Sequence, residues 1–320
     1  MKILVTGGAG YIGSHMVKLL VDTGAEVSVI DDLSTGHADA VRGAQLVQGD
    51  IADIPSTANL LKKRGIEAVV HFAGASQVAE SVANPAKYQA RNVDASLALL
   101  EAMRHAGVAR IVFSSSASVY GDPQRVPIDE THATLPVNPY GASKLAVEHK
   151  LTECSAAYGL RAVSLRYFNA AGADGGLGER HEPETHLIPL VLKSALRKTP
   201  ISVYGTDYPT RDGTCVRDYV HVSDLCSAHL LALERMDKGH DSFNLGNGEG
   251  FTVMEVIDAA RRVTGRRIEM RLSERRPGDP PALVADATKA RRVLGWQPQR
   301  SALERIVADA WQFEQLSSAR

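Results

Sequence analysis

Short apolar segments recur along the first half of the chain, separated by longer segments of mixed polarity. The apolar segments are rich in Val and Ile, and their length is typical of buried β-strands. They are Lys2 to Thr6, Glu26 to Ile30, Gln45 to Val47, Ala68 to Phe72, Arg110 to Ser114 and Arg161 to Tyr167. We therefore expect six strands in this half.

The intervening segments have an apolar residue every three to four positions, which is the period of one helix face. They are Ile12 to Thr23, Thr57 to Arg64, Pro85 to His105 and Pro139 to Tyr158. Strands that alternate with helices predict right-handed crossovers and a parallel sheet covered on both faces. The predicted fold class is therefore α/β, a doubly wound parallel sheet of the Rossmann type.

The pattern changes after Asn169. Residues 170–185 are rich in Gly, Ala and acidic residues, a composition that we expect outside the core. Beyond them the pattern predicts strands at Ile201 to Tyr204 and Ser242 to Leu245, and helices at about Ser223 to Arg235 and Val253 to Val263. We expect a Rossmann domain over residues 1–169 and a smaller mixed α/β domain over 170–320, interleaved because residues 216–247 return to the first domain.

The charge balance excludes several classes of protein. The 320 residues contain 36 basic and 37 acidic side chains, a net charge of -1, whereas nucleic-acid binding needs a strongly basic surface. No stretch of about 18 apolar residues exists to span a membrane. The apolar run at the N-terminus is too short for a signal peptide, so we expect a cytoplasmic protein.

Cysteine and histidine give no sign of a metal site. The three cysteines, Cys154, Cys215 and Cys226, lack paired ligand spacing and are expected as free thiols. The eleven histidines are scattered without a zinc-binding motif, so we expect no bound metal.

A glycine-rich turn follows the first strand. Gly7, Gly10 and Gly13 have a spacing of three, and a helix begins at once, so the backbone can approach a pyrophosphate at the helix N-terminus. Asp31 and Asp32 end the next strand, eighteen residues after Gly13. A carboxylate there accepts hydrogen bonds from ribose hydroxyls and repels a 2′-phosphate, which favours NAD over NADP.

Two further strand ends are candidates for cofactor contacts, because open α/β sheets bind ligands at the carboxyl ends of their strands. Asp50 and Ile51 close the third strand and could meet the adenine. Phe72, Ala73 and Gly74 close the fourth strand, beneath the cofactor.

A tyrosine and a lysine with helical spacing suggest proton transfer. Asn138 and Pro139 suit the start of a helix, which places Tyr140 and Lys144 one turn apart on one face. A nearby ammonium and an oxidised nicotinamide would both favour the phenolate form of the tyrosine. A serine of the fifth strand end, Ser116, could bind the same substrate oxygen.

Together these segments resemble the extended short-chain dehydrogenase/reductases, and the later segments resemble the 4-epimerases of UDP-galactose within them. The first group of motifs is TGGAGYIGSH (6–15), HFAG (71–74), SSSASVYG (114–121), NPYGASK (138–144) and RYFNAAGA (166–173). The second group is PETHLIPL (183–190), YGTDYPTRDGTCVRDYVHVSDL (204–225), NLGNG (244–248) and RRPGDPPALVAD (275–286). The resemblance extends from Met1 to about Trp296.

The resemblance implies an enzyme that oxidises and reduces C4 of a UDP-hexose through a 4-keto intermediate, with tightly held NAD and a homodimer. It implies Ser116 and Tyr140 as the catalytic pair, Lys144 as the electrostatic helper, and Tyr11, Ile12, Asn92 and Tyr167 as further cofactor contacts. The implied substrate contacts are Asn169, His186, Leu187, Ser202, Tyr204, Arg217, Tyr219, Arg276 and Asp279, with Leu283 at the position that selects the C2 substituent of the sugar. Guanidinium groups such as those of Arg217 and Arg276 suit pyrophosphate oxygens.

Several alternatives remain open on the sequence. Leucine at position 283 is intermediate between a bulky aromatic and a small residue, so an N-acetylhexosamine substrate stays possible, as do uronate and pentose substrates. A 4,6-dehydratase is disfavoured, because Ala117 and Ser118 stand where it would need acidic residues. A non-catalytic NAD sensor is disfavoured by the intact pair of Tyr140 and Lys144. Apolar positions such as Leu97, Leu100 and Met103 suit either a helical dimer interface or the core.

Overall fold

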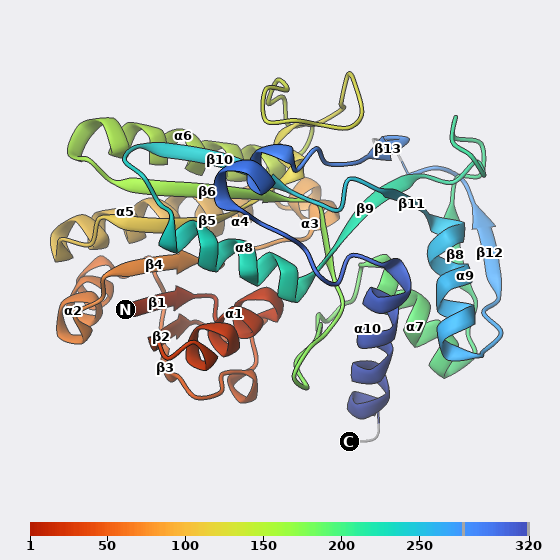
Figure 1. Cartoon of the computed structure of the whole chain (residues 1–320), viewed down its shortest axis with the longest axis horizontal. Helices are drawn as coiled ribbons and strands as arrows, with labels where there is room; N and C mark the ends of the chain where they lie inside the picture. The colour runs from red at the N-terminus through yellow and green to blue at the C-terminus, as the bar shows by residue number, and fades with distance from the viewer. Residues whose placement is uncertain (277–278, 319–320) are drawn as a thin grey trace.

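A seven-stranded parallel sheet dominates the computed structural model, which describes residues 1–276 and 279–318 (Figure 1). The strand order is β10-β6-β5-β4-β1-β2-β3, and all neighbouring strands are parallel. The strands are β1 (Lys2–Thr6), β2 (Glu26–Asp31), β3 (Gln45–Gln48), β4 (Ala68–His71), β5 (Arg110–Ser116), β6 (Arg161–Tyr167) and β10 (His240–Leu245). The predicted doubly wound α/β fold is confirmed.

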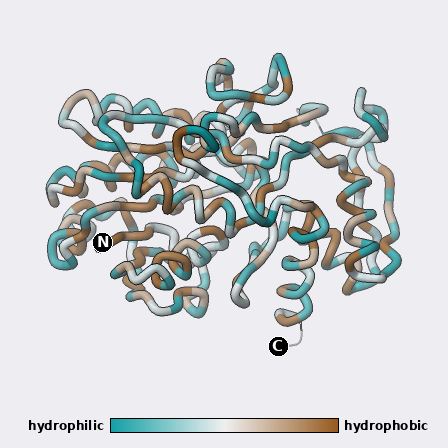
Figure 2. The backbone as a smooth tube through the Cα atoms, viewed as in Figure 1, coloured by the Kyte–Doolittle hydropathy of each residue, from teal (hydrophilic) through white to brown (hydrophobic). Residues whose placement is uncertain are grey.

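Helices cover both faces of this sheet. One face packs on α1 (Tyr11–Asp22) and α8 (Val222–Glu234), and the other on α2 (Ile54–Arg64), α5 (Ala95–Ala106) and α6 (Pro139–Tyr158). Successive strand residues point to opposite faces, so Ile3 and Val5 enter the first core and Leu4 enters the second. Figure 2 shows the resulting hydrophobic colour along the strands of the sheet. The Val- and Ile-rich strands are thus buried on both faces, as their composition predicts.

The strand order reverses between β1 and β4. The chain leaves β1 toward β2 and β3 and then returns to β4 on the other side of β1. A doubly wound sheet binds its ligands at such a switch point, outside the carboxyl ends of the strands. The glycine turn after β1 and the Phe72 to Gly74 segment after β4 therefore meet at this edge.

A smaller body of mixed structure has its own apolar core. Its strands form a four-stranded sheet, with β9 central and β7 beside it, and a two-stranded sheet of β8 and β12. The strands are β7 (Asn169–Ala171), β8 (Ile201–Tyr204), β9 (Val216–His221), β11 (Gly250–Thr252), β12 (Met270–Ser273) and β13 (Ala282–Leu283), and the helices are α7 (Leu187–Arg197), α9 (Val253–Thr264) and α10 (Leu303–Ser318). The two bodies exchange segments, since α8 and β10 belong to the first and Trp296 packs into its core. The domain boundaries given above remain a prediction.

Two sequence expectations differ from the structure. The predicted helix from Pro85 to His105 is interrupted: α4 (Pro85–Tyr88) and α5 are joined by a π-helical turn, η2 (Gln89–Asp94). A single wider turn shifts the period by too little for the apolar spacing to show the change in winding. Residues 170–185 are also less loose than expected, because Ala171 and Leu177 are both 3% exposed. Small side chains allow this segment to pack closely against its neighbours.

The sequence also missed several elements. The short helix α3 (Val78–Ala83) and the turns η1 (Ala38–Ala40), η3 (Ala117–Val119) and η4 (Ala290–Leu294) are too short to show a period. The longer helices α7 and α10 were missed as well, as were all strands of the smaller body except β8. Across the described residues, no helix combines the length and the apolar character that crossing a membrane requires. The motif at residues 275–286 includes residues 277–278, which lie outside the described residues.

Candidate functional site

The glycine turn between β1 and α1 is closely packed. No side chain fits at Gly7 or at Gly13. Gly7 has a φ of +69°, and a Cβ there would lie 2.5 Å from the backbone N of Ala73. A Cβ on Gly13 would lie 2.1 Å from the carbonyl O of Gly7. The first N–H groups of α1 have no partner within the helix and carry its positive dipole end. The helix begins with Tyr11 and Ile12, whose backbone N–H groups are among these first ones. The turn therefore fits the pyrophosphate of a dinucleotide.

The two aspartates at the end of β2, Asp31 and Asp32, have different surroundings. Asp31 is buried, and its carboxylate accepts hydrogen bonds from the backbone N–H of Ala9 and of Leu33, each at 2.9 Å. Asp31 is therefore held against the glycine turn, where a ribose would lie. Asp32 is more exposed, pairs with Arg91, and has a pKa lowered below its usual value by hydrogen bonds from Ser34 and from Arg91, against the opposing effect of burial.

The other predicted cofactor residues lie at the same edge of the sheet. Ile51 is buried, and Asp50 accepts a hydrogen bond from the backbone N–H of Ala52 at 2.9 Å. Phe72 packs against His229, with ring centroids 4.8 Å apart. Asn92 uses its amide group within the protein: it accepts from the N–H of Ala75 at 2.7 Å and donates to Ser143 at 3.0 Å. Asn92 therefore holds the segment after Gly74 against α6.

Tyr140 and Lys144 lie one turn apart near the start of α6. The side chain of Asn138 caps this helix by accepting from the N–H of Gly141 at 2.8 Å, and Pro139 is its first residue. Lys144 donates to the carbonyl O of Ser114 at 2.9 Å. A Cβ on Gly74 would lie 4.0 Å from the Lys144 ammonium, so this charge faces the strand end beneath the cofactor site.

The end of β5 brings Ser116 to this pair. Ser116 is 9% exposed, and its hydroxyl accepts from the N–H of Ser118 at 3.1 Å. Burial raises the pKa of Tyr140, whereas a hydrogen bond with Ser116 lowers it. Tyr167 donates to the hydroxyl of Ser114 and so lies beside the same strand end. The structure thus brings together the three residues that the sequence predicts as catalytic.

The protonation of Lys144 is finely balanced. Burial lowers the pKa of its ammonium to about 8, while the charge of Glu148 opposes this shift. The ammonium also lies 5.8 Å from the ring centroid of Tyr140. A charged Lys144 would favour the phenolate of Tyr140, and with a pKa of about 8 this ammonium is mostly charged at neutral pH.

The predicted substrate residues of the smaller body are joined in pairs. Arg217 on β9 forms an ion pair with Asp279 and donates to the carbonyl O of Pro280 at 3.0 Å. Arg276 lies over the ring of Tyr204, 4.0 Å from its centroid. These two pairs hold both candidate pyrophosphate-binding guanidinium groups in place.

Other predicted substrate residues lie on neighbouring strands. Asn169 is opposite the buried Tyr219 in the pairing of β7 with β9, and its amide donates to the carbonyl O of Asp218 at 2.8 Å. Burial raises the pKa of Tyr219. Ser202 lies on β8 opposite Arg271. Leu283 pairs with Arg217 and packs on the cluster of Val119, Tyr120 and Ile128, directly after the segment that carries Ser116.

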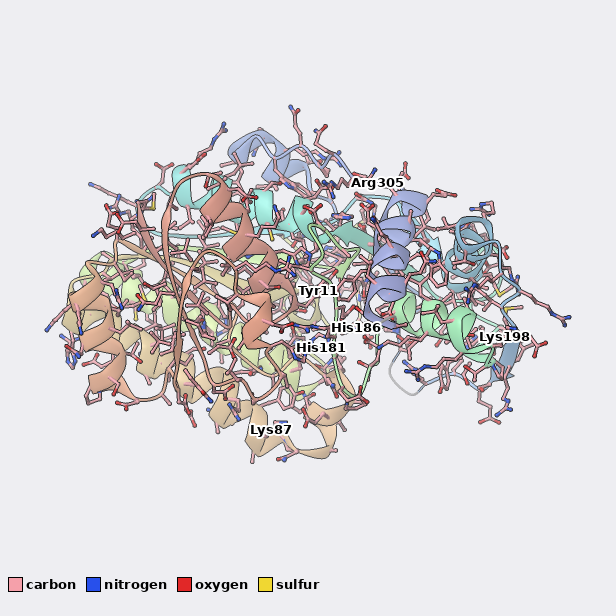
Figure 3. The ribbon with its side chains drawn as sticks, turned by 90° about the horizontal axis from the view of Figure 1, so that it is seen from below. Tyr11, Lys87, His181, His186, Lys198 and Arg305 are labelled. Atoms are coloured by element: carbon pink, nitrogen blue, oxygen red, sulfur yellow. The ribbon has the colours of Figure 1, made fainter. Side chains whose placement is uncertain are left out.

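His186 and Leu187 begin α7, within a compact group of acidic and histidine side chains. His186 lies 2.7 Å from Glu179 and 3.1 Å from Glu184, and His181 lies 2.8 Å from Glu179. Figure 3 shows His181 and His186 close to Tyr11 of the glycine turn. Burial by itself lowers the pKa of His186, but the carboxylates of Glu179 and Glu184 outweigh this effect and raise the pKa to about 10. The imidazole is therefore a cation at neutral pH.

One ligand atom from each of Glu179, His181, Glu184 and His186 could face a common ion, since these atoms all lie within 4.8 Å of one another. The distances between the rings and the carboxylates are those of hydrogen bonds and ion pairs, which satisfy the same atoms without a metal. The expectation of no bound metal stays a prediction. The group shows instead how an acidic pair holds the predicted substrate residue His186.

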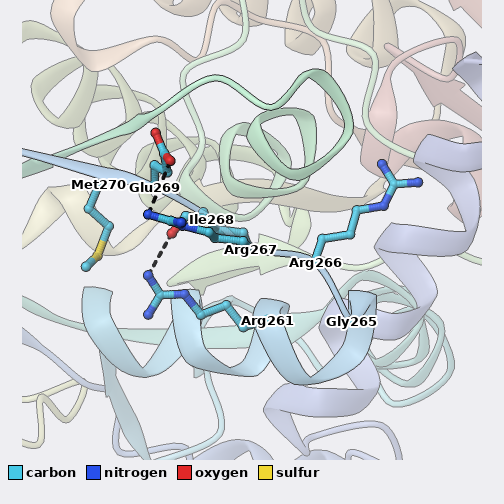
Figure 4. A pocket seen from close by; sticks show the side chains of 7 residues that line it. All are labelled: Arg261, Gly265, Arg266, Arg267, Ile268, Glu269 and Met270. Atoms are coloured by element: carbon cyan, nitrogen blue, oxygen red, sulfur yellow. Dashed lines mark hydrogen bonds and ion pairs between the residues drawn. The ribbon is translucent and has the colours of Figure 1, made fainter.

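Two of the hollows formed by the described residues can be compared with the candidate site. One is lined by Ala9, Gly10 and Tyr11 of the glycine turn together with Gly178 and Arg180, so the turn and the smaller body's loop share its walls. The other lies along α9 and the segment that follows it, and contains none of the predicted site residues (Figure 4). Its arginines are engaged locally, as Arg261 donates to the carbonyl O of Ile268 at 2.7 Å.

Comparison with known proteins identifies the family. Residues 3–246 match the model of the NAD dependent epimerase/dehydratase family. The chain belongs to this family. It is 54% identical to a UDP-glucose 4-epimerase of Streptomyces lividans over 316 residues, which cover 98% of this chain and 95% of that protein.

Solved structures agree with this assignment. The chain is similar to UDP-glucose 4-epimerase from Brucella ovis in complex with NAD, with 47% identity, a TM-score of 0.94 and 97% of each chain covered. It is also similar to UDP-glucose 4-epimerase from Bifidobacterium longum in complex with NAD⁺ and UDP, with 37% identity, a TM-score of 0.94 and 99% of each chain covered. The resemblance seen in the sequence and the prediction of NAD as cofactor are both confirmed.

Proposed function

We propose that this chain interconverts UDP-galactose and UDP-glucose by reversible, NAD-dependent epimerisation at C4. The observation that carries the proposal is the meeting of Ser116, Tyr140 and Lys144 at the end of β5, beside the strand ends that bind a dinucleotide. Such a group suits removal of a hydroxyl proton next to a hydride acceptor. The identity to 4-epimerases over nearly the whole chain supports the same reaction.

In this mechanism Tyr140 takes the proton of the sugar 4-hydroxyl as the C4–H bond breaks. NAD⁺, when bound, supplies the acceptor for the C4 hydride and later returns it. Ser116 orients the hydroxyl by a hydrogen bond, and the Lys144 ammonium stabilises the phenolate. The resulting 4-keto sugar would rotate in the site and present the opposite face of C4 to the returning hydride. Its O4 would then recover the proton from Tyr140. Sugar and cofactor both end at their original oxidation level.

The smaller body would hold the nucleotide end of the substrate. Arg217 and Arg276 would bind the pyrophosphate oxygens, with the His186 cation nearby on the same body. Asp279 would then exchange its contact with Arg217 for a ribose hydroxyl. Asn169, Leu187, Ser202, Tyr204 and Tyr219 would complete the nucleotide contacts.

Leu283 would limit the C2 substituent of the sugar. Its contact with the segment after Ser116 supports this role, because a sugar placed with C4 at Tyr140 would extend toward that segment. A 4-epimerase of UDP-N-acetylhexosamines is the second candidate, since leucine leaves more room than an aromatic ring. A homodimer in the cytoplasm is part of the same proposal and rests on the resemblance to the family.

The direct test incubates the purified protein with UDP-galactose, without added NAD, and follows UDP-glucose. UDP-N-acetylgalactosamine is run in parallel. We expect UDP-glucose to form without added cofactor, and the parallel reaction reports what Leu283 admits. No turnover of either sugar, even with NAD supplied, would contradict the hexose assignment.

A further inference from the structure

We propose that a buried ion pair, Glu148 with Arg166, positions the end of β5 against α6 and thereby sets the geometry of Ser116 and Tyr140. The inference rests on the proposed function and adds two residues that contact neither substrate nor cofactor in that mechanism. Both side chains are deeply buried, with 3% of Glu148 and 9% of Arg166 exposed.

Glu148 joins two strands to the helix that carries Tyr140. Its carboxylate accepts from the Ser115 hydroxyl on β5 at 2.5 Å, and from Nε of Arg166 on β6 at 2.9 Å. Ser115 and Arg166 are direct neighbours in the pairing of β5 with β6. One carboxylate therefore fixes the separation of three elements at the residue that precedes Ser116.

The spacing along α6 makes this contact one of a series. Tyr140, Lys144 and Glu148 are four residues apart in turn and so follow one face of the helix. Lys144 contacts the carbonyl of Ser114 and Glu148 contacts Ser115, while the hydroxyl of Ser116 lowers the pKa of Tyr140 against the larger, opposite effect of burial. Two consecutive residues of β5, directly before Ser116, are thus each held by a side chain of α6.

The network continues past Ser116. Arg166 donates to the hydroxyl of Tyr120 at 3.0 Å and lies 5.1 Å from the centroid of its ring. Tyr120 in turn donates to the side-chain O of Asn244 on β10 at 2.7 Å. Ser116 is therefore flanked on both sides along the chain, at Ser115 and at Tyr120, by contacts that lead to the same ion pair.

Stability alone does not explain this arrangement. A buried ion pair is often matched or exceeded in stability by apolar residues of similar volume, because the desolvation of both charges offsets their attraction. Glu148 lies one helical turn beyond Lys144, and its charge raises the pKa of that ammonium against the larger, opposite effect of burial. A charge placed there acts on the proposed proton transfer, which apolar packing could not do.

Other groups around Lys144 must be considered in any pH experiment. His71 on β4 is buried, and burial lowers its pKa to about 3, so it stays neutral. Tyr140 and Tyr167 are the neighbouring phenols, and burial raises the pKa of both. Glu148 is then the neighbour whose charge raises the pKa of Lys144.

The first test is Ser115→Ala, which removes the contact between β5 and Glu148 and leaves the ion pair. Its matched control is Ser164→Ala, a fully buried serine of β6 whose hydroxyl bonds to His240 at 2.8 Å and not to Glu148 or Arg166. We expect Ser115→Ala to lower kcat about tenfold with little change in KM, and the control to stay within about twofold. Equal kcat in both variants would overturn the proposal.

The second test is the double variant Glu148→Gln with Arg166→Met, which avoids leaving one charge buried alone. We expect it to fold, to lower kcat about a hundredfold, and to shift the alkaline limb of the kcat profile to lower pH, because Lys144 loses the charge that favours its ammonium. A folded variant with the wild-type profile would contradict the proposal.

A third measurement does not depend on the reaction. Hydrogen exchange at residues 114–119 should be at least about tenfold faster in Ser115→Ala than in Ser164→Ala, since the end of β5 loses its tie to α6. Equal exchange rates in the two variants would overturn the positioning role. Failure of the wild-type protein to epimerise UDP-galactose would instead overturn the proposed function, and the exchange measurement would still test the positioning role.

Discussion

The cofactor side and the substrate side of the candidate site are built in different ways. Around the glycine turn, backbone groups and small residues fix the shape, so that added atoms at Gly7 or Gly13 would collide with neighbouring backbone. In the smaller body, charged side chains are paired with one another, as in Arg217 with Asp279 and His186 with Glu179. The cofactor side is thus shaped by its backbone, whereas in the proposed function the substrate side exchanges internal ion pairs for contacts with its ligand.

This difference suits the proposed chemistry. A cofactor that is kept through many cycles needs a site that is complete before binding, which reduces the ordering cost. A substrate that enters and leaves needs contacts that can be replaced, and existing ion pairs keep the charged groups satisfied in between. The contrast can be tested by substitutions on each side, and first at Tyr140, which both cofactor and substrate would contact.

Tyr140→Phe is expected to have the largest effect. Loss of the phenolic oxygen removes the proposed base, so kcat should fall about a thousandfold, while the bound cofactor is retained. Steady-state kinetics and the cofactor content of the purified variant check this. Tyr158→Phe, at the exposed end of the same helix, is the control and should keep full activity.

Gly13→Ala breaks the cofactor side. Its Cβ would lie 2.1 Å from the carbonyl O of Gly7, so the turn must open and the pyrophosphate site is lost. We expect the cofactor content of the purified protein to fall at least about tenfold. Gly49→Ala, whose Cβ would meet only the side chain of Ile30 at 3.6 Å, should bind cofactor normally. Normal cofactor content in both variants would contradict the close packing of the cofactor side.

Arg217→Gln breaks the substrate side. Removing a charged contact to the pyrophosphate should raise KM for UDP-galactose about 10- to 100-fold and change kcat less. Cofactor content should not change. Arg267→Gln, an exposed arginine outside the site, serves as the control. If Arg217→Gln lost as much cofactor as Gly13→Ala, the distinction between the cofactor side and the substrate side would fail.

The smallest effect concerns pH and the His186 group. The pKa of His186 is raised from its usual value of 6.5 to about 10, so its stabilising effect is complete below pH 6.5 and is lost as the pH rises toward 10. Chemical unfolding at pH 6.5 and at pH 9.5 should show a smaller fall in free energy of unfolding for His186→Ala than for wild type. Parallel falls would show that the imidazole has no such cationic role.

Prediction from sequence worked best where a local pattern determines the structure. The strands of the large sheet, the glycine turn and the start of α6 at Asn138 and Pro139 follow from periodicity, positive φ and capping, and the structure has them at nearly the predicted residues. The motifs that carry Ser116 and Tyr140 predict that these two residues meet. Their contact itself depends on the pairing of distant elements.

The remaining features could not be obtained in this way. Glu148 looks like an ordinary helix-surface residue in the sequence, although its position one turn after Lys144 was a usable signal. Its partner Arg166 lies on a different strand, and only sheet pairing brings the two together. The pairing of Arg217 with Asp279 likewise joins residues 62 positions apart. Such contacts arise from tertiary packing, which no local period encodes.

The most direct test of the central claim uses UDP-galactose with deuterium at C4 in ordinary water, with no NAD added. Transfer to a retained cofactor and back predicts UDP-glucose that still carries its deuterium at C4, because the hydride never exchanges with solvent. Product with hydrogen at C4, or a dehydrated sugar, would contradict epimerisation by the proposed route.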